Sequence, residues 1–166
     1  MTENAATNEN SREFGLQRIY TKDISFETPN SPAIFAEKWE PDSNLNLNSS
    51  VTSLQNDLYE VVLSITVTTK IGDKVAYLVE VQQAGIFLAR GFPDQEMSHM
   101  MGAYCPGALF PYAREVISDL VNKGSFPQML LTPVNFDALY AQHMQELQAR
   151  AAAQQAEGGN GQDAAH

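Results

Sequence analysis

The longest period-two pattern in the chain is LYEVVLSITVTTKIGDKVAYLVEVQQAGIF, residues 58–87. Apolar and polar residues alternate along both halves, which is typical of a β-strand with one buried and one solvated face. Residues 72–73, Gly-Asp, separate the halves, so the stretch predicts a β-hairpin. A three-residue turn, 72–74, would pair Ile71 with Val75 and keep the apolar sets on one face. We therefore expect that turn, with a bulge at its glycine.

The polar face of this hairpin carries an apolar residue, Leu78, beside Glu80. Another strand is predicted from the alternation over residues 20–27. Asp23 and Glu27 project from the side of that strand opposite its apolar residues. Carboxylates and one leucine are thus expected on exposed strand faces.

The segment between these strands is less regular. Pro32 and Pro41 bracket a short aromatic stretch containing Phe35 and Trp39, which favours a strand at a sheet edge. The Ser- and Asn-rich residues 42–57 are predicted as a long connection, apart from a possible extension of the preceding strand at their start.

The second half of the chain has helical periodicity. A short helix is expected to begin at Asp94, and residues 102–112, rich in Gly and Pro, are expected to be irregular. A longer amphipathic helix should have Pro111 in its first turn and end at Gly124. Asn135 predicts the N-cap of a final helix. Strands followed by helices indicate an α+β fold, with the helices packed on one face of an antiparallel sheet.

The chain has 166 residues, which favours one domain. The polar residues 1–13 and the low-complexity residues 150–166 are predicted to be disordered tails around a domain at 14–149. We expect a cytoplasmic protein, because no signal-peptide pattern, membrane span or cysteine pair is visible and Cys105 is the single cysteine.

The formal net charge of −10 argues against nucleic-acid binding, which needs clustered Lys and Arg. His99, His143 and Cys105 do not have the spacing of a zinc site, so no metal or cofactor is expected. No residue is placed to act as a base for the thiol, and no carboxylate pair lies in an apolar setting. The sequence therefore predicts a protein that is not an enzyme. Aromatic and Met residues in the irregular segments either complete a small core or form an adaptable apolar groove.

Six blocks of sequence resemble the SecB family of protein-export chaperones, in the family's order over about residues 14–145. They are RIYTKDISFETPN, DLYEVVL, VEVQQAGIF, GAYCP, LFPYAREVISDLV and PVNFDALY. The resemblance implies an α+β fold with a four-stranded antiparallel sheet and a cytoplasmic homotetramer, a dimer of dimers. It also implies an ATP-independent chaperone that holds unfolded precursor proteins and delivers them to the SecA motor ATPase, with no nucleotide bound and no insertion into the membrane.

The resemblance also implies the site residues. The SecA contact would be Asp23, Glu27, Leu78 and Glu80. The client groove would be lined by Phe26, Phe35, Trp39, Phe110 and Tyr112, with residues 42–57 and the final helix as walls. A subunit interface is expected at Gln83, and the apolar helix stripe with Val116 and Leu120 is expected to be buried by a symmetric partner. Two alternatives stay open: a chaperone of the same fold in a system such as toxin control, and a small-ligand-binding α+β domain.

Overall fold

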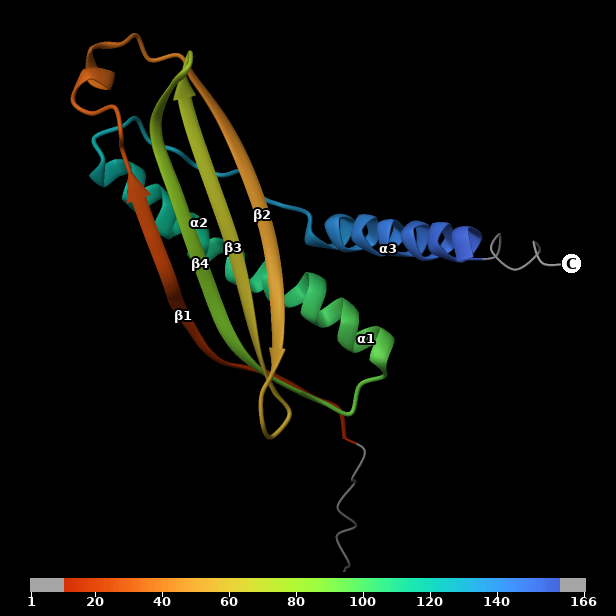
Figure 1. Ribbon diagram of the computed structural model, residues 1–166. Coiled ribbons are helices and arrows are strands. Elements are labelled where there is room, and N and C mark those ends of the chain that lie inside the picture. The colour runs from red at the N-terminus through yellow and green to blue at the C-terminus, as the bar shows by residue number, and fades with distance from the viewer. Residues whose placement is uncertain (1–10, 159–166) are drawn as a thin grey trace, which may run out of the picture.

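The computed structural model describes residues 11–158 of the chain (Figure 1). The elements in chain order are β1 (Glu13–Glu27), the 3-10 helix η1 (Ala33–Ala36), β2 (Pro41–Ser53), β3 (Leu58–Ile71), β4 (Lys74–Arg90), α1 (Asp94–His99), the π-helical turn η2 (Met100–Tyr104), α2 (Cys105–Lys123) and α3 (Phe136–Gly158). The strands form one antiparallel sheet in the order β1-β4-β3-β2. The predicted α+β fold with a four-stranded antiparallel sheet is confirmed. Most of the predicted N-terminal tail and residues 159–166 lie outside the described residues.

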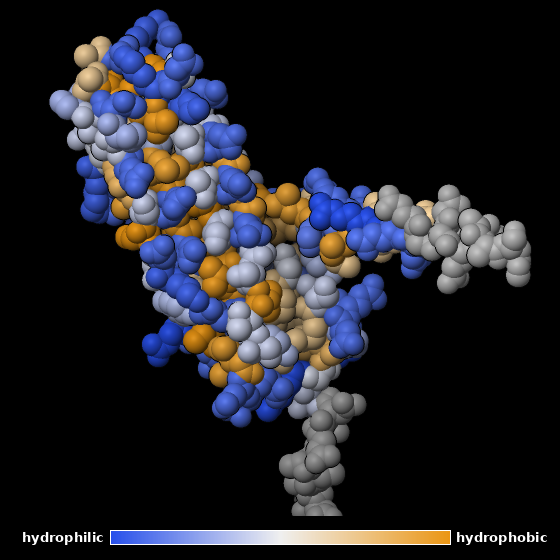
Figure 2. Space-filling view, in the orientation of Figure 1, coloured by the Kyte–Doolittle hydropathy of each residue, from blue (hydrophilic) through white to orange (hydrophobic). Residues whose placement is uncertain are grey.

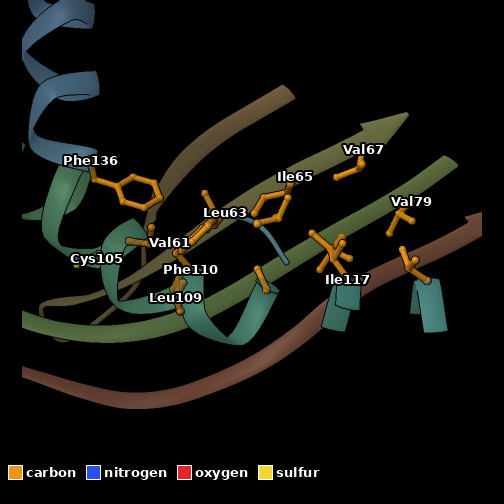
Figure 3. Close-up of a cluster of buried hydrophobic side chains, with 14 of the residues drawn as sticks. Val61, Leu63, Ile65, Val67, Val79, Cys105, Leu109, Phe110, Ile117 and Phe136 are labelled. Carbon is orange, nitrogen blue, oxygen red and sulfur yellow. The ribbon is translucent and has the colours of Figure 1, made fainter. Parts of the chain in front are cut away.

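Helix α2 covers one face of the sheet. In Figure 1 it crosses behind the strands, so the sheet face turned to the viewer carries no helix. The core lies between these two layers, where Leu63 and Ile65 of β3 cluster with Leu109 and Ile117 of α2 (Figure 3), all at most 1% exposed. A Cβ atom at Gly85 of β4 would lie 3.0 Å from Leu109 Cδ2, so this glycine allows the helix to approach the sheet closely.

The predicted hairpin is confirmed, but its predicted turn is wrong. The loop has only residues 72–73, and Ile71 therefore opposes Lys74 instead of Val75. The register then shifts by one residue, because Ala76 has no partner in β3. This bulge in β4 returns the apolar sets of both strands to one face without a longer turn.

Two segments before the hairpin differ from the prediction. Residues 42–57 were expected to form a connection, but most of them belong to β2, which pairs with β3 along its whole length. This edge strand is exposed over most of both faces, so its sequence lacks the apolar alternation of a half-buried strand. The stretch around Phe35 and Trp39 forms the short helix η1 instead of a strand, and Ile34 anchors it at 2% exposure.

The chain is helical from Asp94 to Lys123, through α1, η2 and α2. The prediction of an irregular segment at 102–112 is therefore wrong, and Pro111 lies inside α2 rather than in its first turn. Burial of Leu109 against the sheet stabilises the helix there despite the Gly and Pro residues. The helix ends at Gly124, as predicted.

Helix α3 begins where it was predicted. The backbone N–H of Ala138 donates a hydrogen bond of 3.0 Å to Asn135 Oδ1, which is an N-cap. Phe136 is buried in the core, and the rest of the helix projects from the body of the molecule (Figure 1). Residues 150–158, predicted as the start of a disordered tail, are helical. Within residues 11–158, no helix has both the length and the apolar character needed to cross a membrane.

Candidate functional site

The four residues predicted to contact SecA lie together on the sheet face that carries no helix. In the β1–β4 ladder Glu27 opposes Leu78, and Ser25 opposes Glu80. Asp23, Ser25 and Glu27 alternate along β1 and share one face. Figure 2 shows this side of the molecule, with hydrophilic and hydrophobic residues interspersed over the sheet. We call Asp23, Glu27, Leu78 and Glu80 the acidic patch.

The negative charge of the acidic patch is not compensated by ion pairs. Asp23, Glu27 and Glu80 are exposed, and Leu78 is half-buried. None of the ion pairs formed within residues 11–158 involves these three carboxylates. The adjoining rows of the same face carry uncharged polar residues, Ser64, Thr66 and Thr68 on β3 and Asn44, Asn46 and Asn48 on β2. The patch is thus a flat, negative surface with one apolar side chain, suited to a cationic partner.

A hydrogen-bonded group of three residues adjoins the acidic patch on the same face. Glu60 of β3 accepts a hydrogen bond from the Tyr20 hydroxyl and forms an ion pair of 2.8 Å with Lys22 Nζ. Both partners belong to β1, so the group spans β4, where Tyr20 lies opposite the small residue Ala84. The bonds from Lys22 and then Tyr20 hold the pKa of Glu60 below its usual value. Burial, followed by the bond to Glu60, raises the pKa of Tyr20 to about 12.

Three of the aromatic residues predicted for the client groove gather at one end of the sheet. Phe35 and Trp39 pack against Phe126, with ring centroids 5.2 and 5.9 Å apart. Phe126 lies 5.0 Å from Tyr77, whose ring stacks on Phe26 at 6.1 Å. These five rings are called the aromatic cluster. Phe35 is 51% exposed, so the cluster is open to solvent.

The structure places the other two predicted groove residues elsewhere. Phe110 is 5% exposed, and its ring packs against Phe136 in the core, 5.7 Å away (Figure 3). Tyr112 is 51% exposed and lines a depression between β1 and α2 with Ile19. Among the described ring pairs, neither residue pairs with a ring of the aromatic cluster.

The predicted interface residues lie between the sheet and α2. Gln83 is 3% exposed, and its Oε1 accepts a hydrogen bond of 3.2 Å from Thr21 Oγ1. Val116 lines the same depression as Gln83, and Leu120 follows one turn later on α2, half-buried against the core. The adjoining edge strand leaves Leu16 46% exposed. An apolar surface therefore extends from β1 to α2.

A further apolar cleft lies between β2 and α3. Leu47 and Val51 line one wall, and Leu139 and Leu147 line the other. Figure 2 shows this cleft as a hollow beside the projecting helix. The two predicted groove walls, residues 42–57 and the final helix, thus face each other across a cleft that does not include the aromatic cluster.

Two of the side chains considered for catalysis or metal binding, Cys105 and His99, are buried or already paired. The described residues hold no group of three or more His, Cys, Asp or Glu side chains arranged to bind a metal ion. Cys105 is 0% exposed, and burial raises the pKa of its thiol to about 12, so the thiol stays protonated at neutral pH. His99 pairs with Asp137 at the start of α3, with 2.7 Å between Nε2 and Oδ1.

Comparison with known proteins assigns the chain to a family. A family model described as "SecB: Preprotein translocase subunit SecB" matches residues 7–147. The chain belongs to the SecB family. It is 61% identical over 140 residues to a protein from Methylococcus capsulatus named "Protein-export protein SecB", covering 84% of this chain and 90% of the relative. A protein of the same name from Marinobacter nauticus is 57% identical over 145 residues, covering 87% and 88% of the two chains.

A solved structure shares the SecB fold. It is a SecB-like chaperone from Mycobacterium tuberculosis in complex with a ChAD peptide from an antitoxin. The likeness has a TM-score of 0.61 at 16% identity and covers 73% of this chain and 90% of the other. The predicted membership of the SecB family and the chaperone function in protein export are confirmed, whereas the site residues stay predictions.

Several residues that the structure of this SecB-family chain brings to the acidic patch and the aromatic cluster were not among those predicted from the sequence. Tyr77 belongs to the apolar alternation of the hairpin, and Phe126 is one of the aromatic residues in the irregular segments, but neither was predicted to line the client groove. Both residues are aromatic, which suggested that they could contribute to an apolar surface. Their contact with each other, however, depends on how β4 packs against the end of α2. The link from Tyr20 and Lys22 to Glu60 was missed because it crosses β4, which no local pattern indicates.

Proposed function

We propose that this chain is an ATP-independent SecB chaperone that holds unfolded precursor proteins in the cytoplasm and delivers them to SecA, without catalysing a reaction. The proposal is carried by the uncompensated acidic patch on the helix-free sheet face. The aromatic cluster and the cleft between β2 and α3 lie at other places on the molecule. A client and a cationic partner can therefore be bound at the same time.

Client binding depends on apolar surface that folded proteins hide. Burying about 400 Å² of an extended apolar segment gives roughly 10 kcal/mol before the costs of ordering are subtracted. The open aromatic cluster with Phe35 and Trp39 supplies such a surface, and we assign it to the client groove together with the cleft beside α3. Binding the unfolded chain opposes its folding by mass action, so no ATP is needed.

A homotetramer would multiply these sites. Exposed apolar residues along β1 and the half-buried Val116 and Leu120 of α2 offer a surface that a symmetric copy can cover, and Gln83 lines the depression between these two elements. Several client segments held by four subunits gain from effective concentration, while each single contact can exchange. Sedimentation at micromolar protein should give a tetramer, and a monomer would contradict this assembly.

SecA binding is assigned to the acidic patch. Each exposed ion pair contributes only about 0–1 kcal/mol, so one patch should bind weakly and lose affinity as salt rises. Leu78, which lies opposite Glu27 in the ladder, provides an apolar side chain within the patch that SecA can contact. Repetition of the patch by symmetry would strengthen binding.

The decisive experiment separates the two surfaces. Glu80→Lys should abolish capture of SecA in a pull-down and leave binding of an unfolded precursor unchanged. Asp73→Lys, the same charge change on the exposed hairpin turn, is the control and should retain both activities. Retained SecA binding by Glu80→Lys would overturn the assignment of SecA binding to the acidic patch. Absence of SecA capture by the wild-type chain would instead favour the alternative of a chaperone in a toxin-control system.

A further inference from the structure

The bulge in β1 brings a cation next to the acidic patch. The register between β1 and β4 shifts between Thr21 and Asp23, so Lys22 has no partner in β4. Bulges re-aim side chains, and here Lys22 Nζ reaches Glu60 on the helix-free face. Lys22 and Asp23 are thus successive residues whose side chains project from the same face. An ammonium group in this position is expected to neutralise the adjacent carboxylate.

Glu60 binds this ammonium group instead. The ion pair measures 2.8 Å, and the Glu60 side chain is 17% exposed, against 45% for Lys22. Tyr20 donates its hydroxyl to the second oxygen of the same carboxylate, which fixes the acceptor. A partly buried pair is screened less by salt than a fully exposed pair, so the link should persist at physiological ionic strength.

We propose that Glu60 is a positioning residue of the acidic patch, which holds the Lys22 ammonium group over β3 and keeps Asp23 free for a cationic partner. The inference rests on the proposed function, because it takes SecA as that partner. Without the Glu60 acceptor, the flexible stem of Lys22 can turn toward Asp23 and neutralise it. Tyr20 supports this arrangement by holding Glu60 in place.

A double-mutant cycle tests the role of Glu60 through SecA binding measured by titration calorimetry. Glu60→Gln removes the charge but keeps an oxygen that can accept the Tyr20 hydrogen bond. It should weaken SecA binding by about two- to fivefold, the range of one surface ion pair. Lys22→Met should change affinity by less than about twofold in the wild-type chain, where Lys22 is already bound. In the Glu60→Gln chain the same change should restore the wild-type affinity.

This rescue separates positioning from simpler effects. A folding defect caused by Glu60→Gln would weaken the binding of SecA and of an unfolded precursor together, whereas loss of positioning would weaken SecA binding alone. If Lys22→Met acted only through net charge, it would change SecA affinity by the same factor in the wild-type and the Glu60→Gln chains. That result would overturn the inference. Lys70→Met is the matched control, because Lys70 lies on the same face but forms no ion pair within the described residues. Lys70→Met should change SecA affinity by the same factor in the wild-type and the Glu60→Gln chains.

The cycle also distinguishes this inference from the proposed function. Loss of SecA binding in Glu80→Lys, together with unchanged binding in Glu60→Gln, would overturn the positioning role alone. Absence of SecA binding by the wild-type chain would overturn both. The predicted rescue by Lys22→Met supports both.

Discussion

The ring of Phe26 lies directly against Gly124, where α2 ends. A Cβ atom at position 124 would lie 2.9 Å from Phe26 Cε1 and 3.0 Å from Phe126 Cδ2. The backbone at Gly124 has a φ of −75°, which any residue adopts, so the close approach of the rings alone requires glycine. The bare backbone at the end of α2 therefore lets two rings of the aromatic cluster pack together.

Gly124→Ala should destabilise the chain by forcing these rings apart. Overpacking of this kind costs about 1–3 kcal/mol, measured as the loss in free energy of unfolding by urea at fixed protein concentration. Gly107→Ala is the control, because its Cβ atom would meet Phe136 Cδ2 at an ordinary 3.6 Å. Alanine is also favoured over glycine inside a helix by about 0.5–1 kcal/mol, so this variant should be unchanged or more stable. Equal stabilities of the two variants would contradict the packing argument.

The predictions from sequence succeeded where one face of an element is buried. The hairpin of β3 and β4 and the end of α2 at Gly124 followed from periodicity, because burial on one side enforces it. β2 was missed because it is an edge strand, with Leu45 still 43% exposed on its less polar face. The first turns of α2 were missed because Gly and Pro suggest a loop, whereas burial of Leu109 and Cys105 determines the structure there.

The acidic patch could be predicted only in part from local pattern. The alternation pattern predicted that Asp23 and Glu27 share one strand face and that Leu78 and Glu80 share another. Only the resemblance to the SecB family assigned all four residues to one surface. The structure supplies the reason for their proximity, which is the antiparallel pairing of β1 with β4. That pairing joins strands far apart in sequence, and periodicity within each strand cannot specify it.

Gly102→Ala should loosen the attachment of α3. A Cβ atom at Gly102 would lie 2.6 Å from Cδ2 of Tyr140, whose hydroxyl is hydrogen-bonded to Ser98 at 2.8 Å. We expect faster amide hydrogen exchange in residues 136–147 and unchanged exchange in β3. Tyr140→Phe, which removes only the hydrogen bond, should have a smaller effect. Unchanged exchange in Gly102→Ala would show that this contact does not hold the helix.

Alkaline pH should destabilise the fold through Cys105. Burial raises the pKa of the thiol from 9.0 to about 12, so at pH values between these the folded chain keeps a proton that the unfolded chain releases. This contribution to stability is fully present below pH 9 and is lost as the pH rises toward 12. Urea unfolding at about pH 8 and about pH 10 should show a smaller decrease in stability for Cys105→Ala than for the wild type. Equal decreases in the two chains would contradict the assignment.

Trp39→Asp should abolish client holding. Trp39 packs on Phe126 at 5.9 Å, and a charged side chain there would require desolvation whenever an apolar client segment covers the aromatic cluster. The measurement is suppression of aggregation of an unfolded precursor during dilution from denaturant, with SecA capture scored separately and expected to be retained.

Tyr104→Asp is the matched control for Trp39→Asp, since Tyr104 is an aromatic residue, 59% exposed, that packs on Phe14 outside the aromatic cluster and outside the predicted groove walls. It should suppress aggregation as the wild type does, because it changes the same kind of residue without touching the cluster. If Trp39→Asp also keeps full suppression, the aromatic cluster is not the client groove. The cleft between Leu47 and Leu139 would then be the next surface to test with the same assay.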